Sequence, residues 1–505
     1  MELFLTLDIG TTSIKVGVVD LFGKIIAFST QEYALLTPKK GWVELNPETY
    51  WCNCLLGIRD VLSQLNKAGI SSDNILSISV CSQGETVIFL DKSGNPLQNA
   101  IVWLDTRAKK EAEELNDRFG EISCTGQSEI DPILTAPKIL WFKKHREELF
   151  KKIHKVVLVG DYILYRLTGE FIGDFSLYST TALLDIRERK WFMPMLNTLE
   201  LPVSKLVTLV ESGEIIGPLT ASVIDELNFS DSILAVSGGM DQTLAMVGAG
   251  NIESGIVTET TGAALALCST LESYSSNLRL SVQPHAVPGK YLITGWLPSG
   301  GMSLKWARNT LFSTEWEKWE IDGENPYDKM TMAEEFPEPG SGGLFFYPFM
   351  SGSGPVPVDS SARGIWYGLE LHHSRKHLIS SIMEGLAFIT KYILSDIEME
   401  CGPSEELRVM GGGAYNSRWN QMKADITGRK VNVLSSVETA TVGTAILQSV
   451  SLKKYNSIEE AADQMVNFQE SYYPVNLSAP YQEIYQEYIE IMKLFSNREE
   501  IIEKV

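Results

Sequence analysis

The sequence predicts an α/β protein built from two similar halves, and three observations support this. Apolar strand-like segments alternate with helical patterns along the chain. A strand, a turn rich in Thr and Gly and a second strand occur near the N-terminus, and the same pattern returns at residues 255–268. Two further strands end in glycines that lead into helices, at 238–239 and 411–413. The repeat suggests an internal duplication, with a ligand site in the cleft between the halves.

The composition is that of an acidic globular protein. The chain has 505 residues, 44% hydrophobic and 21% charged, and 43 Lys and Arg against 64 Asp and Glu give a net charge of −21. Such a surface repels phosphate backbones and anionic membranes, so we expect neither nucleic acid nor a membrane as a partner. The N-terminus lacks a signal-peptide pattern, no apolar run is long enough to span a bilayer, and the six scattered cysteines are typical of reduced thiols. We therefore expect a cytoplasmic protein.

The elements of the first half follow from local patterns. Apolar runs separated by short turns predict an antiparallel meander with strands at Leu3–Leu7, Ile14–Val19 and Lys24–Phe28. Pro47 suits a first helical turn, and apolar residues at helical spacing predict a helix over 47–66. The same reasoning predicts strands at Ile75–Cys81 and Ile233–Val236, and helices near 107–119, 136–151, 160–168 and Met240–Val247.

The second half opens with the second hairpin. Strands are predicted at Gly255–Glu259 and Ala263–Cys268, with a turn at residues 260–262 between them. A strand at Leu407–Met410 runs through three glycines into a helix at 415–427. Further helices are predicted at 301–311, 374–399 and, as a charged amphipathic tail, 480–505.

The usual nucleotide-binding motifs are missing, so a nucleotide site must be built from turns. There is no GxxxxGK[ST], no GxGxxG opening a βαβ unit and no GxSxG. In DIGTTSIK (8–15), Gly10 lets a ligand approach the backbone, and N–H groups with the hydroxyls of Thr11, Thr12 and Ser13 can cradle phosphate oxygens. Lys15 adds positive charge, and Asp8 could hold Mg²⁺ through water. The alternative is a plain polar hairpin turn.

Two segments of the second half could complete such a site. TETTGAA (258–264) matches the first hairpin, and two hairpins facing across a cleft could hold a triphosphate from both sides. MGGGAYN (410–416) would let a flat ligand such as adenine pack on the backbone. The alternatives are a second ordinary hairpin and a tight turn that needs positive φ.

A carboxylate follows the glycine pair of the first half. In GGMDQ (238–242), the strand ends and projects Asp241 into the first turn of a helix, whose N-terminus favours the ionised form. A carboxylate at the bottom of a cleft is a natural general base for a hydroxyl, and an aspartate at its ordinary pKa is fully ionised at pH 7. The alternative is an acid that only serves the helix dipole.

Two longer stretches carry a resemblance to a known family. LTAPKILWFKKH (134–145) and GIWYGLELHHSRKHLISSIMEG (364–385) look like the two signatures of the FGGY carbohydrate kinases, and the chain resembles that family from about residue 3 to about residue 450. The resemblance implies an actin- and hexokinase-like (ribonuclease H-like) ATPase fold of two lobes, each a mixed sheet with helices, that close on ATP and sugar. It implies an N-terminal lobe at 1–247, a C-terminal lobe at 248–455 and a helical extension at 456–505.

The resemblance also implies roles for the residues of these motifs. Asp241 is similar to the catalytic base, and Asp8 to the metal-associated acid, so that Mg²⁺ is expected at Asp8 and Asp241. Gly10, Thr11, Thr12, Ser13 and Lys15 match the first phosphate hairpin and Thr260, Thr261 and Gly262 the second. The remaining nucleotide contacts are expected at Gly300, Gly301, Gly412, Gly413, Ala414 and Asn416. Dimers are common in similar kinases, which leaves a homodimer open.

The acceptor is expected to be a ketose. The family binds its acceptor with segments that correspond here to Gln83, Gly84, Glu85, Trp103, Asp105 and Gln242. Residues 82–86 resemble the corresponding stretch of glycerol kinases, which carry Arg where Gly84 stands and, further along, an aromatic where Ile133 stands. Gly84 is therefore interpreted as leaving room for an acceptor with a longer carbon chain. Residues 103–107 resemble the Trp-x-Asp-x-Arg stretch of xylulokinase-like members. We therefore expect a pentulose such as xylulose or a 6-deoxyhexulose such as fuculose.

Other functions stay open at this point. Within the enzymes, the runner-up is a glycerol or other polyol kinase. The alternative from another class is a non-metabolic actin- or chaperone-like ATPase on the same fold. A sugar-binding regulator that has lost catalysis is a third possibility, which Asp241 and the two hairpins oppose.

Overall fold

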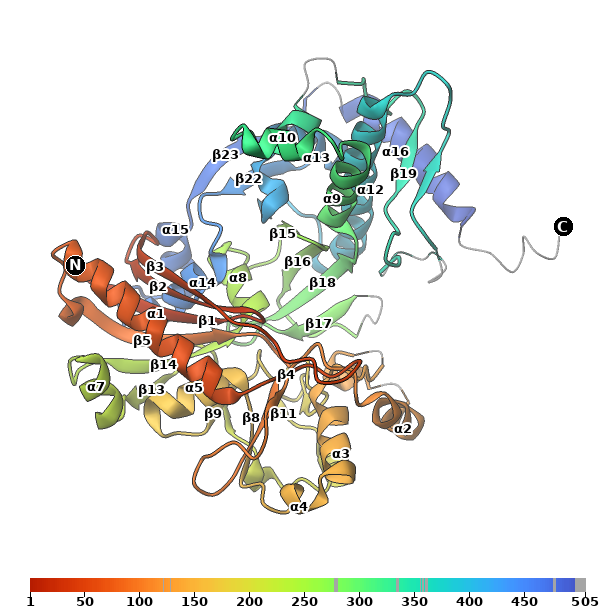
Figure 1. The fold of residues 1–505 in the computed structure, drawn as a ribbon. Coiled ribbons are helices and arrows are strands. Elements are labelled where there is room, and N and C mark those ends of the chain that lie inside the picture. The colour runs from red at the N-terminus through yellow and green to blue at the C-terminus, as the bar shows by residue number, and fades with distance from the viewer. Residues whose placement is uncertain are drawn as a thin grey trace. The chain divides into compact units, whose positions relative to one another are not determined.

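The computed structural model describes residues 1–495 except 121, 128, 277–279, 333–335, 355, 357, 359–361 and 476–477. The described chain forms two compact units (Figure 1). Unit 1 contains Met1–Ile252, Glu272–Leu292 and Glu438–Asn467, and unit 2 contains Glu253–Leu271, Ile293–Val437 and Phe468–Val505. The domain boundaries implied by the resemblance, at 247/248 and 455/456, stay predictions.

A six-stranded mixed sheet forms the centre of unit 1. Its order is β13-β14-β5-β1-β2-β3, from β1 (Leu3–Ile9), β2 (Ser13–Asp20), β3 (Ile25–Glu32), β5 (Ile75–Ser82), β13 (Ile215–Pro218) and β14 (Leu234–Met240). β1, β2 and β3 are antiparallel neighbours, which confirms the predicted meander, while β5 is parallel to both β1 and β14. Leu3, Phe4, Leu5 and Leu7 are fully buried, as expected for a strand covered on both faces.

Two helices cover opposite faces of this sheet. Neighbouring residues of a strand point to opposite faces. Val16 contacts α1 (Pro47–Lys67), while Gly17 faces α14 (Thr439–Ser451). A Cβ at Gly57 in α1 would lie 2.5 Å from Val16 Cγ2, and one at Gly17 would lie 2.5 Å from Thr441 Cγ2. Both helices can therefore approach the sheet this closely only because glycine stands at these two positions.

The rest of unit 1 surrounds a second, four-stranded sheet. Its order is β4-β7-β6-β8, from β4 (Glu44–Leu45), β6 (Val87–Leu90), β7 (Ala100–Ile101) and β8 (Lys155–Leu158). Buried side chains of this sheet pack on α3 (Thr135–His145), where Phe89 and Phe142 stack with ring centroids 4.0 Å apart. The predicted helix 136–151 is wrong in its extent, because Arg146 (φ −139°) leaves the helical conformation and α4 (Glu147–Phe150) follows separately.

The other elements of unit 1 are short or peripheral. The helices are α2 (Lys109–Phe119), α5 (Val159–Thr168), α6 (Met193–Leu199), α7 (Ala221–Leu227), α8 (Asp241–Gly248) and α15 (Ile458–Met465). The small strands are β9 (Ile172–Asp174), β10 (Leu184–Asp185), β11 (Lys190–Trp191) and β12 (Thr208–Val210). Single 3₁₀ turns lie at Ser72–Asn74, Ser123–Thr125 and Val203–Lys205.

The second large sheet repeats the strand order of the first. Its order is β17-β18-β16-β15-β21-β22-β23, from β15 (Ile256–Thr261), β16 (Leu265–Leu271), β17 (Ser281–Pro284), β18 (Tyr291–Leu297), β21 (Glu406–Met410), β22 (Lys430–Leu434) and β23 (Phe468–Tyr472). As in the first sheet, a hairpin is followed by two parallel strands and one antiparallel strand. This common topology supports the predicted internal duplication.

Unit 2 contains the longest helix of the described chain, α12 (Arg375–Cys401). By length and composition alone α12 could cross a membrane, but 78% of its most apolar window is buried in the protein, as in a core helix. The other described helices are α9 (Gly300–Leu311), α10 (Trp316–Ile321), α11 (Pro326–Thr331), α13 (Ser417–Thr427) and α16 (Ser478–Lys493). Two short strands, β19 (Phe345–Tyr347) and β20 (Ile365–Tyr367), pair antiparallel with each other.

Two predicted helix boundaries in unit 2 differ from the structure. The helix predicted from residue 415 begins at Ser417, because Gly412–Tyr415 form a 3₁₀ turn and Asn416 caps the helix. The predicted tail helix is present as α16, and the part of that prediction beyond residue 495 lies outside the described residues.

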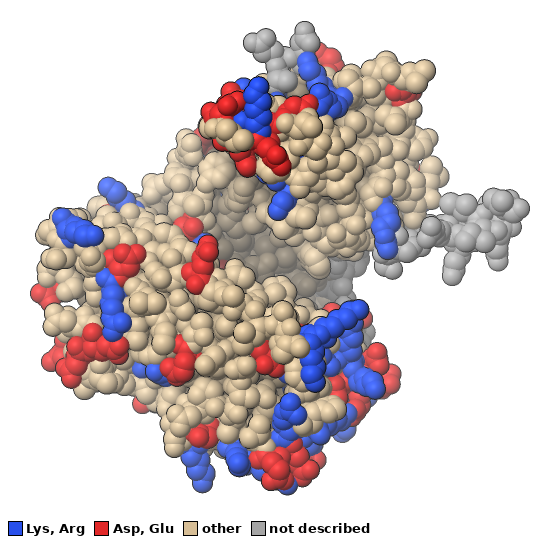
Figure 2. Space-filling model, in the orientation of Figure 1, with Lys and Arg blue, Asp and Glu red and all other residues tan. Residues whose placement is uncertain are grey.

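On the face drawn in Figure 2, acidic and basic side chains of the described residues are interspersed.

Candidate functional site

The two acids singled out in the sequence lie at strand ends of the same sheet. Asp8 is the next-to-last residue of β1, and Asp241 is the first residue of α8, directly after β14. Their strands flank β5, so both carboxylates lie at one edge of the sheet. Position 238 in β14 must be glycine, because a Cβ there would lie 1.8 Å from Val80 O of β5. The register of the β14–β5 pairing shifts at this point.

The surroundings of these acids disfavour their charged forms. Burial, followed by the nearby charge of Asp8, raises the pKa of Asp241 to about 7. Burial raises the pKa of Asp8 to about 6, although the charge of Lys15 acts against this shift. The expectation that Asp241 is fully ionised at pH 7 is therefore wrong for these surroundings. A divalent cation would relieve this unfavourable charge, and one or two carboxylates with water and phosphate oxygens are what Mg²⁺ prefers, so the two residues fit it.

The first hairpin turn is held by contacts from three other segments. Gly10 N–H donates to Ser13 O (3.0 Å), while Gly10 O accepts from Tyr33 Oη and from Gln83 Nε2. Trp103 Nε1 donates to Thr11 Oγ1 (2.9 Å). These bonds fix the turn beside the predicted acceptor residues.

Two further residues of this hairpin differ in their surroundings. Thr12 is exposed at the tip. Lys15 faces Asp8 across the hairpin register and also forms an ion pair with Glu438 (2.6 Å), which the sequence did not suggest.

The predicted acceptor segment 83–85 lies next to the base. Gln83 is 3% exposed, its Nε2 is bonded to the first hairpin, and its Oε1 is a buried acceptor with no partner in the described structure. A Cβ at Gly84 would lie 3.0 Å from Thr180 Oγ1 and 3.5 Å from Met240 Cε. Thr180 and Met240 therefore lie close to Gly84, and the interpretation that Gly84 leaves room for a longer acceptor stays a prediction. The same contact places the segment beside Met240, the neighbour of Asp241.

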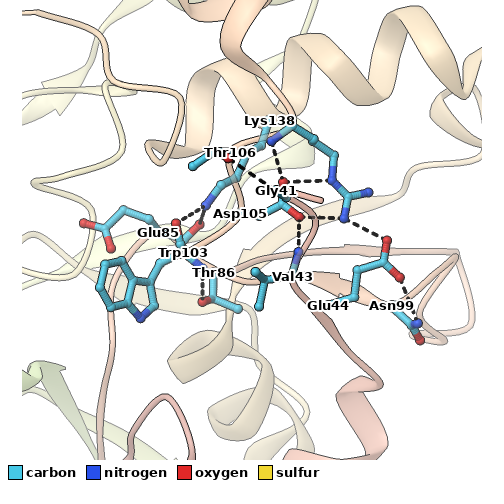
Figure 3. Close-up of polar contacts among 11 residues, drawn as sticks. Gly41, Val43, Glu44, Glu85, Thr86, Asn99, Trp103, Asp105, Thr106 and Lys138 are labelled. Atoms are coloured by element: carbon cyan, nitrogen blue, oxygen red, sulfur yellow. Dashed lines mark hydrogen bonds and ion pairs between the residues drawn. The ribbon is translucent and has the colours of Figure 1, made fainter. Parts of the chain in front are cut away.

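The other predicted acceptor residues divide into two groups. Trp103 is half-buried, and Figure 3 shows its ring beside the Glu85 side chain. Asp105 is fully buried, and its carboxylate accepts from Val43 N (2.5 Å) (Figure 3). The same carboxylate accepts from the Arg107 guanidinium (2.7 Å). In this geometry the Asp105 carboxylate is bound by Val43 and Arg107 of the protein itself rather than directed at a ligand. Gln242 Oε1 accepts from Gln283 Nε2 (3.1 Å). The sequence patterns did not indicate Gln283.

Unit 2 contains a cavity of 440 Å³ at the second hairpin. Among the predicted nucleotide residues it is lined by Thr261, Gly262, Gly301, Gly412, Gly413 and Asn416, whereas Thr260, Gly300 and Ala414 do not line it. Two more lining residues, Ala263 and Tyr415, lie within the predicted motifs. Sequence patterns missed eight others: Met302, Leu304, Lys305, Asn325, Tyr327, Asp328, Thr331 and Trp419. Several belong to α11, which no glycine-rich turn marks, or follow the glycine pair that opens α9. Lys305 supplies a cationic group to this lining.

The glycines around this cavity allow backbone segments to approach each other. A Cβ at Gly301 would lie 2.3 Å from Gly262 O, and one at Gly413 would lie 2.7 Å from Thr261 Cβ. Gly411 has φ +81°, and a Cβ there would meet Thr261 O at 2.8 Å. These glycines therefore let the second hairpin, α9 and the turn after β21 pack together, which is a different reason from the close approach of a ligand.

A buried ion pair supports the second hairpin from inside the protein. Lys423 Nζ lies 2.6 Å from Glu259 Oε1, with side-chain exposures of 1% and 0%. The same carboxylate oxygen accepts from Thr261 Oγ1, and Lys423 lies 4.4 Å from the centroid of the Trp419 ring. Because the Thr261 hydroxyl gives its proton to Glu259, it is not available in this arrangement to donate to a phosphate.

Two family models match the chain: the N-terminal domain of the FGGY family of carbohydrate kinases at residues 3–248, and its C-terminal domain at residues 259–452. The chain belongs to the FGGY family of carbohydrate kinases. This confirms the resemblance inferred from residues 134–145 and 364–385. The protein is therefore a carbohydrate kinase, a phosphotransferase with an alcohol group as acceptor, and family membership implies sugar and ATP as its substrates.

Relatives of this FGGY kinase differ in the acceptor that their names give. It is 28% identical to a xylulose kinase of Bacillus subtilis over 479 residues (94% of this chain, 93% of the relative) and 31% identical to a glycerol kinase of Thermococcus gammatolerans over 470 residues (90% of each). A gluconokinase of Bacillus subtilis is also 28% identical, over 505 residues (99% and 96%). A ligand-bound xylulose kinase from Lactobacillus acidophilus has the same fold, with a TM-score of 0.87 at 24% identity over 99% of both chains.

Proposed function

We propose that this FGGY kinase transfers the γ-phosphoryl group of ATP to a hydroxyl of a ketose, a pentulose such as xylulose. The observation that carries the proposal is the pairing of Met240 with Ser82 at the ends of β14 and β5, which brings the segment 83–85 next to Asp241. The charge of Glu85 contributes to the raised pKa of Asp241, as expected for neighbouring groups. Hydrogen-bonding groups for several hydroxyls thus adjoin a single candidate base.

The cavity in unit 2 supports the nucleotide half of this proposal. Its volume of 440 Å³ suits a nucleoside. The Trp419 and Tyr327 side chains offer apolar surface, and Lys305 offers a charge that complements phosphate. We assign the adenosine part of ATP to this cavity and Mg²⁺ to Asp8 and Asp241. When bound, the metal ion would neutralise negative charge on the phosphates.

The proposed reaction is an in-line displacement at the γ-phosphorus. The transition state for such transfers is loose, so positioning and charge neutralisation supply most of the catalysis. Asp241 accepts the proton of the attacking hydroxyl. Its raised pKa brings it closer to the value at which a general base works best near neutral pH. Gln83, Glu85 and Trp103 would hold the acceptor, and the hydroxyl of Thr11 is held by Trp103.

A ketose is favoured over glycerol by residues 103–107 and by the xylulose kinases among the relatives. A polyol kinase is the second candidate, because the glycerol kinase of Thermococcus gammatolerans is 31% identical. We also propose that the enzyme acts in the cytoplasm, where its six scattered cysteines would stay reduced.

A coupled ADP-release screen tests the acceptor. With ketopentoses, 6-deoxyhexuloses, gluconate, glycerol and other polyols offered in turn, we expect a pentulose to give a kcat/KM at least about tenfold above that of glycerol, which corresponds to about 1.4 kcal/mol in transition-state binding. Glycerol as the best substrate would replace the ketose by the second candidate. ATP hydrolysis that no acceptor stimulates would remove the proposed function altogether.

The pH dependence of turnover tests the proposed base. Because only ionised Asp241 accepts a proton, kcat/KM for the acceptor should be constant above the pKa of Asp241, which burial raises to about 7 and bound Mg²⁺ would lower. It should fall about tenfold per unit as the pH drops below that value. The Asp8→Asn variant removes a neighbouring negative charge, so its residual activity should show this limb at lower pH. A wild-type profile that is flat from pH 5 to pH 8 contradicts the assignment.

A further inference from the structure

Lys138 of α3 is a buried ammonium group that contacts both predicted acceptor segments. The residue is 0% exposed, although lysine is rarely buried without a specific partner. Its Nζ donates to Glu85 O and to Trp103 O, each at 3.3 Å (Figure 3). Burial lowers the pKa of Lys138, and the nearby carboxylate of Glu85 acts in the opposite direction. A single buried amine thus donates to the backbone carbonyls of both Glu85 and Trp103, the residues whose side chains are expected to bind the acceptor.

The backbone at Glu85 is in a conformation that needs such support. Glu85 has φ +55°, in the left-handed region that residues other than glycine rarely adopt. Thr86 N–H closes a tight turn onto Gly84 O (2.6 Å), and Glu85 O accepts from Thr135 Oγ1 (3.3 Å) as well as from Lys138. Strained residues persist where the surrounding structure fixes them, and they gather at functional sites.

The second segment is fixed from both sides. Trp103 N–H donates to Thr86 Oγ1 (3.0 Å), and its carbonyl accepts from Lys138. Beyond it, Arg107 is bound by Asp105 and Glu44, and its guanidinium lies 3.7 Å from the centroid of the Trp42 ring. Lys138 and Thr86 are thus two links that join residues 83–86 to residues 103–107.

We propose that Lys138 is a positioning residue for the acceptor. It holds the Glu85 and Trp103 backbones in one fixed arrangement, and its charge opposes the effect of burial on the Glu85 carboxyl, so that this group can accept hydrogen bonds from acceptor hydroxyls. The proposal rests on the proposed function, but it applies to whichever acceptor the ADP-release screen identifies. Thr86 contributes to the same arrangement without a charge.

Steady-state kinetics of the full-length enzyme with Lys138→Met test this role. We expect KM for the acceptor to rise at least about tenfold, the loss of roughly 1.4 kcal/mol of binding, while KM for ATP stays within about twofold. Lys138→Arg keeps the charge and should recover part of the acceptor affinity. The matched control is Lys143→Met on the same helix, whose ion pair with Glu200 (3.0 Å) is partly exposed and should be kinetically silent.

Thr86→Val provides a second test that leaves no charge uncompensated. It removes the hydroxyl that accepts from Trp103 N–H, so it should raise KM for the acceptor in the same direction by a smaller factor. If Lys138→Met does not fold, this variant decides. Equal changes in both KM values, or an unchanged acceptor KM in the variant that folds, would overturn the positioning role. Failure of the wild-type enzyme to phosphorylate any acceptor would instead remove the proposed function.

Discussion

Asp241→Asn is expected to lower kcat for sugar phosphorylation by about 10²–10⁴-fold, the usual contribution of a general base. The amide keeps the size and the hydrogen bond from Gln242 N–H (2.6 Å) but cannot take the proton of the hydroxyl. ADP binding should be preserved, since the proposed adenosine cavity consists of residues of unit 2. Turnover by ADP release and nucleotide affinity by calorimetry separate the two effects.

The control for this variant is Asp60→Asn, an exposed acid of α1 that should change neither quantity. Retention of Asp241→Asn turnover within about tenfold of wild type would show that the proton leaves by another route, because loss of a general base changes rates by more than this. A parallel loss of nucleotide affinity would point instead to the metal-associated role of Asp241.

Lys423→Met should destabilise the protein by about 3–5 kcal/mol, because it leaves the charge of Glu259 buried without its ammonium partner. Chemical denaturation should show the loss as a lower midpoint for the transition that includes unit 2. ADP should bind more weakly to the folded variant, since Glu259 also accepts from Thr261, whose side chain lines the cavity.

A double substitution distinguishes the buried charge from simple loss of packing. Lys423→Met combined with Glu259→Gln removes both charges and should recover a large part of the lost stability. Lys329→Met is the matched control, because its ion pair with Glu324 (2.7 Å) is 44% and 41% exposed and should contribute at most about 1 kcal/mol. A Lys423→Met variant as stable as this control would show that the Glu259 charge is compensated by other groups.

The strand-ending motifs could be predicted from sequence because they are local. Gly10 and the threonines after it sit at the hairpin turn, and Asp241 directly follows a strand, as predicted. The four-stranded sheet was missed, since β4 and β7 contain only two residues each and present no periodicity. Gly238 shows the intermediate case: the glycine pair marks a site, but the contact with Val80 O that requires it depends on strand pairing.

Residues whose role depends on distant neighbours could not be predicted. Lys138 stands within an apolar helix pattern, and only the fold brings the carbonyls of Glu85 and Trp103 to it. Thr180 lies beside Gly84, although nearly a hundred residues separate the two positions along the chain. The 325–331 segment reaches the cavity through α11, where its sequence has no feature that distinguishes it from an ordinary surface helix.

The position of α14 has a consequence for synthesis on the ribosome. Val442, Ala445 and Ile446 of this helix pack with Phe4 and Val19 from the start of the chain, and residues up to 467 belong to unit 1. Until this late segment emerges from the exit tunnel, the nascent sheet carries an uncovered apolar face. Unit 1 therefore cannot complete its core until residues 438–467 have been synthesised. Until then the exposed apolar face must stay unfolded or be covered by a chaperone.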